Sequence, residues 1–217
     1  MDWIIIPARQ NSKGLPGKNR KLFSFTADQI PFLYKDKTIV TTDDTFILSQ
    51  ALSYGFLAYY RKESLCQDNS NIKDVLLDVI ENSYPEISKR DIITMLYLTY
   101  PERRWNQVIK TYRFFKDNHA NSLLCREEKT QEEIHPYRWF YDNKNGTGTQ
   151  IVKHNLYRRQ DYPLMFKVNH FIFMAYANEI KKLNKNLWNK NTIFYPIDIP
   201  IDIDNIKDYE AFQRGIR

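Results

Sequence analysis

Residues 1–23, MDWIIIPARQNSKGLPGKNRKLF, join a short apolar run to a strongly basic segment. The run from Trp3 to Ile6 is rich in isoleucine and bounded by a proline, which predicts a buried strand. Five basic residues and no acidic residue follow between Arg9 and Lys21. Because ligands of an open α/β sheet bind just beyond the carboxyl ends of its strands, this basic segment is placed to hold an anion such as a phosphate chain.

Short apolar runs and helical periodicities alternate over the residues that follow. Further strands are predicted at residues 38–41, 57–60, 92–97 and 122–125. Apolar residues at helical spacing predict helices over 72–80 and 105–115. Another helix would begin after a cap at Asp43 or Asp44 and stop at Gly55. This alternation predicts the α/β class, with a mostly parallel sheet that carries helices on both faces.

The second half of the chain has a different pattern. Between residues 139 and 153 it is polar and glycine-rich, which predicts a hairpin that leaves the sheet. A strand at 171–175 and a short helix near 178–183 follow. The end of the chain has the pattern of a strand, an acidic turn and a helix capped by Asp204 or Asn205. We therefore predict one domain over residues 1–217 with an excursion around 139–170.

Composition restricts the classes of protein that fit. The chain has 217 residues, of which 42% are hydrophobic, so it can bury a sizeable core. Its net charge of +6 is spread over 32 basic and 26 acidic residues, a mixture that argues against a nucleic-acid-binding arm. No apolar run approaches the length of a membrane span, and the N-terminus leads into a strand rather than a signal peptide. We expect a cytoplasmic protein with no nucleic-acid or membrane partner, whose lone Cys66 and Cys125 are buried or incidental.

The basic segment has the features of a phosphate-binding loop. Gly14 and Gly17 would let the backbone approach an anion closely, while Pro16 restrains the loop. Lys13 and Lys18 can reach phosphate oxygens that backbone N–H groups leave uncovered. The segment is not a Walker A motif, because GLPGKN has too few residues between its glycines and an asparagine after its lysine. Taken alone, it also fits a solvent-exposed basic loop without a ligand.

A longer pattern extends this interpretation. Residues 4–19, IIIPARQNSKGLPGKN, closely resemble the signature that opens the acylneuraminate cytidylyltransferases and their relatives acting on 3-deoxy-octulosonic acid. Further blocks resemble that family in the same order: IVTTDD at 39–44, YRKESLCQD at 60–68, YLTYPER at 97–103, RRQDYP at 158–163 and PIDIDNIKD at 200–208. The resemblance implies a Rossmann-like, GT-A-type nucleotidyltransferase sheet with a small dimerisation excursion, and hence a homodimer.

The resemblance also implies a reaction and the residues that carry it out. Enzymes of this family transfer CMP from CTP to the anomeric hydroxyl of an acidic keto sugar such as sialic acid, and release pyrophosphate. The implied nucleotide contacts are Arg9, Ser12, Lys13, Lys18, Asn19, Arg61, Tyr97 and Thr99. Arg9 and Lys18 would be catalytic, because fixed cations stabilise the negative charge that develops during attack on the α-phosphorus. A surface salt bridge is the alternative for Arg61.

Two carboxylates near the C-terminus complete the implied catalytic set. Asp202 and Asp204 lie two residues apart, so on an extended segment both point to one face while Ile203 points to the other. Mg²⁺ is usually held by one or two carboxylates together with phosphate oxygens and water. We therefore expect Mg²⁺ as the cofactor, with Asp202 and Asp204 as its ligands. An acidic solvent-facing strand that ends in a helix cap is the alternative.

Basic and polar residues in the second half would bind the acidic acceptor. The family resemblance places basic groups near the carboxylate of the acceptor, and Arg138 and Arg159 occupy the positions that match them. The planar guanidinium of arginine can bind both oxygens of a carboxylate. The resemblance adds Gln160, Asn169, His170 and Phe173 to this set.

The acceptor side also departs from the family pattern. His170 stands where the family has a glycine, Tyr97 replaces a glutamine, and Leu98 and Tyr100 replace a proline and a serine. The segment 22–39 is shorter than its family counterpart, which predicts an abbreviated first crossover. These departures leave open an octulosonic acid or a phosphonate as acceptor, or nucleotide binding without turnover. A degenerate enzyme would show damage in the catalytic set, and none is visible.

Overall fold

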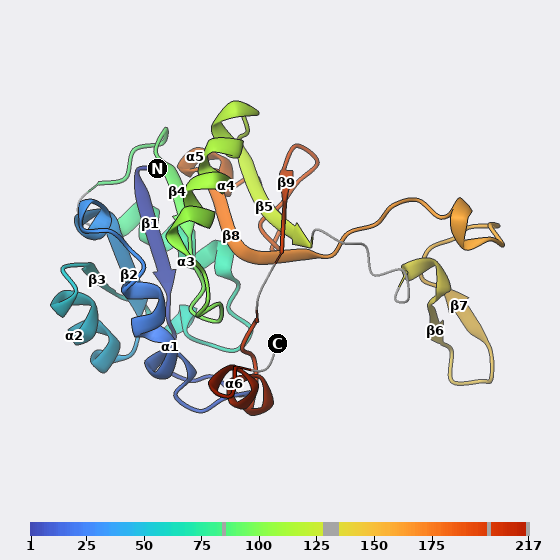
Figure 1. Ribbon diagram of the computed structural model, residues 1–217, viewed down its shortest axis with the longest axis horizontal. Coiled ribbons are helices and arrows are strands. Elements are labelled where there is room, and N and C mark those ends of the chain that lie inside the picture. The colour runs from blue at the N-terminus through green and yellow to red at the C-terminus, as the bar shows by residue number, and fades with distance from the viewer. Residues whose placement is uncertain (84–85, 128–134, 199–200, 216–217) are drawn as a thin grey trace.

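The protein is described by a computed structural model that covers residues 1–83, 86–127, 135–198 and 201–215. Figure 1 shows a body built around a sheet and an arm, residues 135–167, that extends away from it. The sheet has the strand order β3-β2-β1-β4-β8-β5-β9. Its strands are β1 Trp3–Pro7, β2 Thr38–Thr42, β3 Leu57–Tyr60, β4 Ile92–Met95, β5 Ser122–Glu127, β8 Val168–Tyr176 and β9 Ile193–Ile197.

The pairing confirms a mostly parallel sheet. β1 pairs in parallel with β2 and β4, β2 with β3, and β5 with β9. β8 runs antiparallel to both of its neighbours, β4 and β5. Because β8 returns from the arm in the reverse direction, it joins two groups of parallel strands, and the pattern of apolar residues did not predict this.

Helices cover both faces of the sheet, as the alternation predicted. Their bounds are α1 Lys18–Ala27, α2 Thr45–Ser53, α3 Ile72–Asn82, α4 Trp105–Asp117, α5 Ala177–Ile180 and α6 Ile206–Gln213. Ile4 and Ile6 of β1 are buried in one cluster with residues of α1, α2 and α4. Ile5, which points to the other face, is buried with residues of α3 and α5. No described helix is long and apolar enough to cross a membrane.

The helix caps resolve two alternatives that the sequence left open. Asp44, rather than Asp43, caps α2 by accepting a hydrogen bond from the Phe46 N–H at 3.0 Å. Asn205, rather than Asp204, caps α6. Asp204 is therefore available for other contacts.

Two element boundaries differ from the prediction in ways that shape the site. β4 ends at Met95, two residues before the predicted end, so Tyr97 leaves the strand ladder. α1, which the sequence pattern did not predict, begins at Lys18 directly after Gly17, whose φ of 65° lies in the left-handed region. The first crossover consists of α1 and a 3₁₀ turn at Phe32–Lys37.

The arm confirms the predicted hairpin. β6 Phe140–Asp142 and β7 Gly148–Gln150 form a separate two-stranded antiparallel sheet. Figure 1 shows this sheet well away from the seven-stranded one. The arm connects to the body through β8 on one side.

Candidate active site

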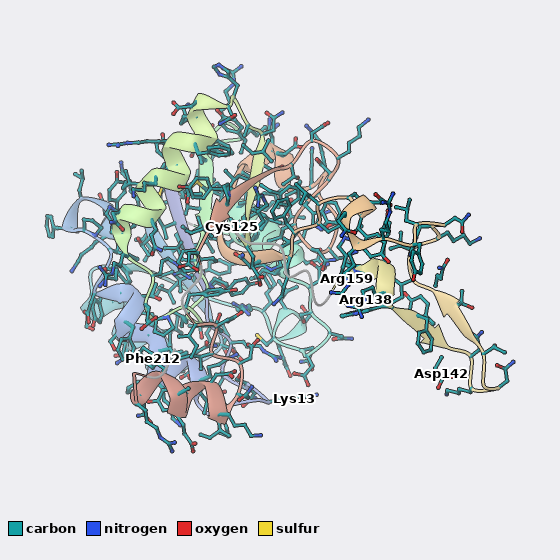
Figure 2. All side chains as sticks on the ribbon, turned by 45° about the vertical axis from the view of Figure 1, so that its right-hand side comes forward. Lys13, Cys125, Arg138, Asp142, Arg159 and Phe212 are labelled. Carbon is teal, nitrogen blue, oxygen red and sulfur yellow. The ribbon has the colours of Figure 1, made fainter. Side chains whose placement is uncertain are left out.

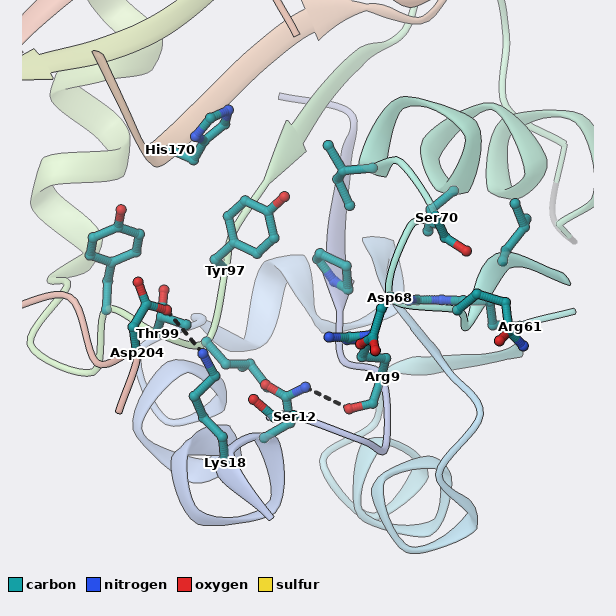
Figure 3. A pocket seen from close by; sticks show the side chains of 18 residues that line it. Arg9, Ser12, Lys18, Arg61, Asp68, Ser70, Tyr97, Thr99, His170 and Asp204 are labelled. Atoms are coloured by element: carbon teal, nitrogen blue, oxygen red, sulfur yellow. Dashed lines mark hydrogen bonds and ion pairs between the residues drawn. The ribbon is translucent and has the colours of Figure 1, made fainter. Parts of the chain in front are cut away.

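A cleft of about 390 Å³ opens where β1, β3 and β4 end (Figure 3). It is lined by segments that lie far apart in the sequence. The predicted residues among its lining are Arg9, Ser12, Lys18, Asn19, Arg61, Tyr97, Thr99, His170 and Asp204. The fold therefore brings most of the predicted nucleotide residues together with His170 and one of the two proposed metal ligands.

The loop after β1 is held in place by the chain itself. The Asn19 side-chain amide donates to the backbone carbonyl of Arg9 at 2.7 Å, which closes the loop onto the start of α1 (Figure 3). A Cβ on Gly14 would lie 2.2 Å from the backbone oxygen of Asp204. The close approach of the Asp204 segment therefore requires a glycine at this position.

Each cation of this loop faces a carboxylate. Lys18 Nζ lies 3.0 Å from Asp204 Oδ1. Arg9 Nη1 lies 2.8 Å from Asp68 Oδ1, and Lys13 Nζ lies 2.5 Å from Asp68 Oδ2. Hydrogen bonds from Lys13 and Arg9 hold the pKa of Asp68 below its usual value. Lys13 points outward, with 81% of its side chain exposed, and lines an adjoining depression rather than the cleft.

Arg61 supplies a positive charge from a second strand end. The residue is 4% exposed, and its Nη2 donates to the Thr41 carbonyl at 2.7 Å. Burial lowers the pKa of the guanidinium. Within the described residues Arg61 has no salt bridge, so the surface ion pair considered for it is not what this structure contains. A buried cation in a cleft favours an anionic ligand.

Asp204 lies on the opposite side of the cleft from Arg61, and Asp202 lies two residues before it (Figure 3). Ile203 between them is fully buried, and its N–H donates to the Thr99 carbonyl at 2.8 Å, which ties this segment to the residues after β4. Burial raises the pKa of Asp202, hydrogen bonds from Thr99 and Tyr100 oppose the rise, and nearby Asp204 adds to it. A carboxylate whose charge is disfavoured by burial and by a neighbouring carboxylate is a suitable place for a cation.

Tyr97 and His170 form an aromatic wall of the cleft. Their ring centroids lie 6.0 Å apart with the rings at 81°. Burial lowers the pKa of His170, whose Nε2 lies 3.3 Å from the Asn186 carbonyl. Burial therefore disfavours the charged form of His170.

Several predicted acceptor residues do not reach this cleft. Arg138 and Arg159 lie on the arm (Figure 2). Arg159 and Gln160 line a separate pocket of about 250 Å³ on the arm.

The other two predicted acceptor residues are buried. Phe173 is fully buried in the core and pairs with Met95 of β4, so it is a packing residue rather than a lining one. Asn169 is also buried, and its Oδ1 accepts a hydrogen bond from the Phe171 N–H at 3.1 Å. Phe173 lies in the core rather than in the cleft lining, because it joins the ladder where β4 is still a strand.

The structure adds lining residues that the sequence did not single out. Gln67, Asp68 and Ser70 come from the loop between β3 and α3, and Ile72 and Val75 from the start of α3. The family-like block at 60–68 ends at Asp68, which was the available signal for this loop.

No family model matches the chain, but curated proteins do. Pseudaminic acid cytidylyltransferase of Campylobacter jejuni is 28% identical over 219 residues, covering 95% of this chain and 92% of that protein. CMP-N,N'-diacetyllegionaminic acid synthase of Legionella pneumophila is 25% identical over 229 residues, covering 97% and 94%. N-acylneuraminate cytidylyltransferase of Streptococcus agalactiae is 24% identical over 217 residues, covering 94% of this chain and 51% of that protein. The resemblance to the acylneuraminate cytidylyltransferases is confirmed.

Solved structures agree on the fold. CMP:2-keto-3-deoxy-manno-octonic acid synthetase, solved in complex with CTP, superposes with a TM-score of 0.67 at 16% identity, covering 98% of this chain and 97% of that one. A 4-diphosphocytidyl-2C-methyl-D-erythritol synthase superposes with a TM-score of 0.60 at 8% identity, covering 99% and 98%. The seven-stranded sheet is thus a cytidylyltransferase fold.

Proposed function

We propose that this chain is a cytidylyltransferase that transfers CMP from CTP to a hydroxyl of an acidic keto sugar and releases pyrophosphate. The observation that carries the proposal is the convergence of Arg9, Lys18, Arg61 and Asp204 in one cleft. These residues come from separate blocks of the sequence that resemble the family. Similarity to cytidylyltransferases along nearly the whole length of both chains supports the same reaction.

The cations suit phosphoryl chemistry. Attack on the α-phosphorus of CTP builds negative charge on its oxygens and on the departing pyrophosphate, and preorganised cations stabilise this charge. The Lys18 side chain is only 13% exposed, so its ammonium acts where water screens charge less than at the surface. We assign the stabilisation of the transition state to Lys18 and Arg9, with Arg61 as a nucleotide contact.

Asp202 and Asp204 would hold Mg²⁺. The described residues contain no cluster of three or more ligand-type side chains, so protein groups alone do not complete a metal site there. Two carboxylates together with phosphate oxygens and water suit Mg²⁺, and Asp204 already faces a cation in Lys18. Bound there, the metal would neutralise phosphate charge and lower the pKa of the attacking hydroxyl.

The acceptor we propose is an acidic sugar of the kind named in the relatives: pseudaminic, legionaminic or N-acylneuraminic acid. His170 would contact the sugar at the wall of the cleft. We reassign Tyr97, which the family resemblance gave as a nucleotide contact, to the sugar, because its ring lies against His170. Because burial disfavours the charged form of His170, we look to another cation for the carboxylate of the acceptor. Arg138 and Arg159 are suitable in chemistry, although they lie on the arm.

We also propose that the chain acts as a homodimer in the cytoplasm, where CTP is available. The arm exposes large apolar side chains, among them Tyr157, Leu164, Phe140 and Tyr141. Exposed apolar surface of this kind is typical of an interface. A second copy would cover it and bring arm residues near a cleft. Light scattering should give twice the chain mass of 26.1 kDa, whereas a monomer at all concentrations would contradict this assignment.

The reaction is tested by pyrophosphate release. CTP, UTP, ATP and GTP are each combined with pseudaminic, legionaminic, sialic and octulosonic acids in the presence of Mg²⁺. We expect release with CTP and at least one nine-carbon acid. Release with the octulosonic acid alone would favour that acceptor instead. Binding of CTP without release for any acid would identify a nucleotide-binding protein without turnover and refute the proposed reaction.

A further inference from the structure

We propose that Arg103 is a positioning residue that fixes the Tyr97–His170 wall and thereby sets the affinity for the acceptor. The inference rests on the proposed function, because it assigns that wall to the acceptor. Arg103 does not line the cleft. It would act through the backbone of the residues that do.

The contacts of Arg103 join the two segments that carry the wall. The residue is 3% exposed. Its Nη2 donates to the Tyr97 carbonyl at 2.5 Å, and its Nε donates to the Phe171 carbonyl at 3.0 Å. Phe171 directly follows His170 on β8. One guanidinium therefore holds the backbone of one wall residue and that of the immediate neighbour of the other.

These contacts lie where the strand ladder is interrupted. The last pair between β4 and β8 is Met95 with Phe173, so Tyr97 and Phe171 are the positions that the ladder would next align on one face. On the other side of β8, the pairing with β5 shifts register between Leu123 and Cys125. The Arg103 fork thus replaces ladder hydrogen bonds at a point where β8 has lost regular partners on both edges.

Burying the charge of Arg103 costs free energy, which argues against a role in packing alone. No salt bridge involves Arg103 in the described part of the chain, and its Nη1 has no hydrogen-bond partner there. Its guanidinium lies 5.6 Å from the Tyr100 ring centroid and 5.2 Å from that of Phe171, which compensates part of the cost. Burial lowers the pKa of Arg103 to about 10, so it stays charged at neutral pH.

An apolar side chain would fill this space without the cost of burying a charge. What an apolar residue lacks is the planar fork that reaches both carbonyls at once. Lysine keeps the charge but donates from a single nitrogen, so it cannot reproduce the fork. Arg103→Lys therefore separates the geometry of the fork from its charge.

The test compares Arg103→Lys with Arg113→Lys, an exposed arginine on α4. Pyrophosphate release is measured while CTP and the acceptor acid are varied separately. We expect the KM for the acceptor to rise about tenfold in Arg103→Lys, with the KM for CTP changed by less than about twofold, and no change in Arg113→Lys. Equal changes in both KM values, or an unchanged acceptor KM in a folded variant, would overturn the proposal.

A double-mutant cycle distinguishes positioning from a general loss of stability. If Arg103 acts through the wall, Arg103→Lys should add little to the acceptor KM once His170 is replaced by alanine. Full additivity would argue against the proposal. If Arg103→Lys does not fold, Phe171→Leu removes one ring that flanks the guanidinium, and it should raise the acceptor KM in the same selective way or the proposal fails.

The two proposals fail differently. Absence of pyrophosphate release by the wild type with every acid would refute the proposed function, and the role of Arg103 with it. Release by the wild type, together with an unchanged acceptor KM in Arg103→Lys, would refute only the role of Arg103.

Discussion

The loop after β1 and the arm contain the two groups of basic residues that the sequence analysis assigned to the nucleotide and to the acceptor. The two groups differ in how many of their residues reach the cleft and in which partners they have. In the loop, Arg9, Lys13 and Lys18 each face a carboxylate of the same chain. On the arm, Arg159 lines a pocket outside the cleft, among exposed apolar side chains. If the proposed roles hold, the nucleotide side of the site is assembled within one chain, whereas the acceptor side depends on the position of the arm.

The largest expected effect concerns the proposed metal ligands, one of which, Asp204, pairs with Lys18 of the loop. Asp204→Asn and Asp202→Asn keep the shape of the side chain but remove its charge, so turnover should fall by about 10³ or more while the melting temperature stays nearly constant. Raised Mg²⁺ or added Mn²⁺ should restore part of the activity.

Asp198→Asn is the matched control, because Asp198 is an exposed acid shortly before this segment. It should remain fully active. Wild-type activity that persists in EDTA would contradict the metal assignment.

The next effect in size concerns the loop cation beside Asp204. Lys18→Ala should lower turnover by about 10² to 10³, the scale for loss of one preorganised contact to the transition state. Lys21→Ala removes an exposed lysine of α1 that packs over the Tyr209 ring, and it should leave turnover unchanged. Equal activity of both variants would favour the alternative interpretation, in which the loop is a solvent-exposed basic segment without a ligand.

The sequence predicted that most of the proposed nucleotide contacts come together at one edge of the sheet, because these residues follow strands or begin a helix. Arg9 follows β1, Arg61 follows β3, and Lys18 begins α1. A short apolar run shows that a strand exists and where it ends to within about two residues, and ligands bind beyond those ends.

The acceptor side could not be predicted to the same extent, because it depends on long-range pairing. Local pattern does not show that β8 runs antiparallel between β4 and β5. That pairing buries Phe173 against Met95 and leaves His170 at the cleft. β8 is largely buried on both faces, so its sequence lacks the alternation that would separate core from lining residues.

A smaller effect is expected for the arm, where two neighbouring arginines provide a test and its control. Arg159→Ala should raise the KM for the acceptor about tenfold with little change in the KM for CTP, if the arm supplies a cation for the acceptor carboxylate. Arg158→Ala is the control, because Arg158 is 74% exposed and pairs with Asp161 at 3.4 Å. A rise in both KM values, or in neither, would remove Arg159 from the acceptor site.

The smallest effect concerns Asp68, which pairs with two cations of the loop. Unlike the other substitutions, its replacement should improve a kinetic constant. Its carboxylate holds Arg9 and Lys13 with one oxygen each, as two oxygens of a phosphate could. The triphosphate of CTP must compete with this carboxylate for the same cations and is repelled by its charge. Asp68→Asn should therefore lower the KM for CTP by about two- to fivefold, a modest change because these ion pairs are partly exposed and screened by solvent.

The dependence on salt concentration tests whether competition between Asp68 and CTP causes the lower KM. The advantage of Asp68→Asn over the wild type should shrink as ionic strength rises from about 0.01 M to about 1 M, because screening weakens the interactions of exposed charges. Asp74→Asn, a nearby acid in the first turn of α3, should show neither the gain nor its salt dependence. A higher KM for CTP in Asp68→Asn would mean that Asp68 holds Arg9 and Lys13 ready for the nucleotide rather than competing with it. The paired cations of the loop would then be a preorganised site, and the difference between loop and arm would be larger than the competition account implies.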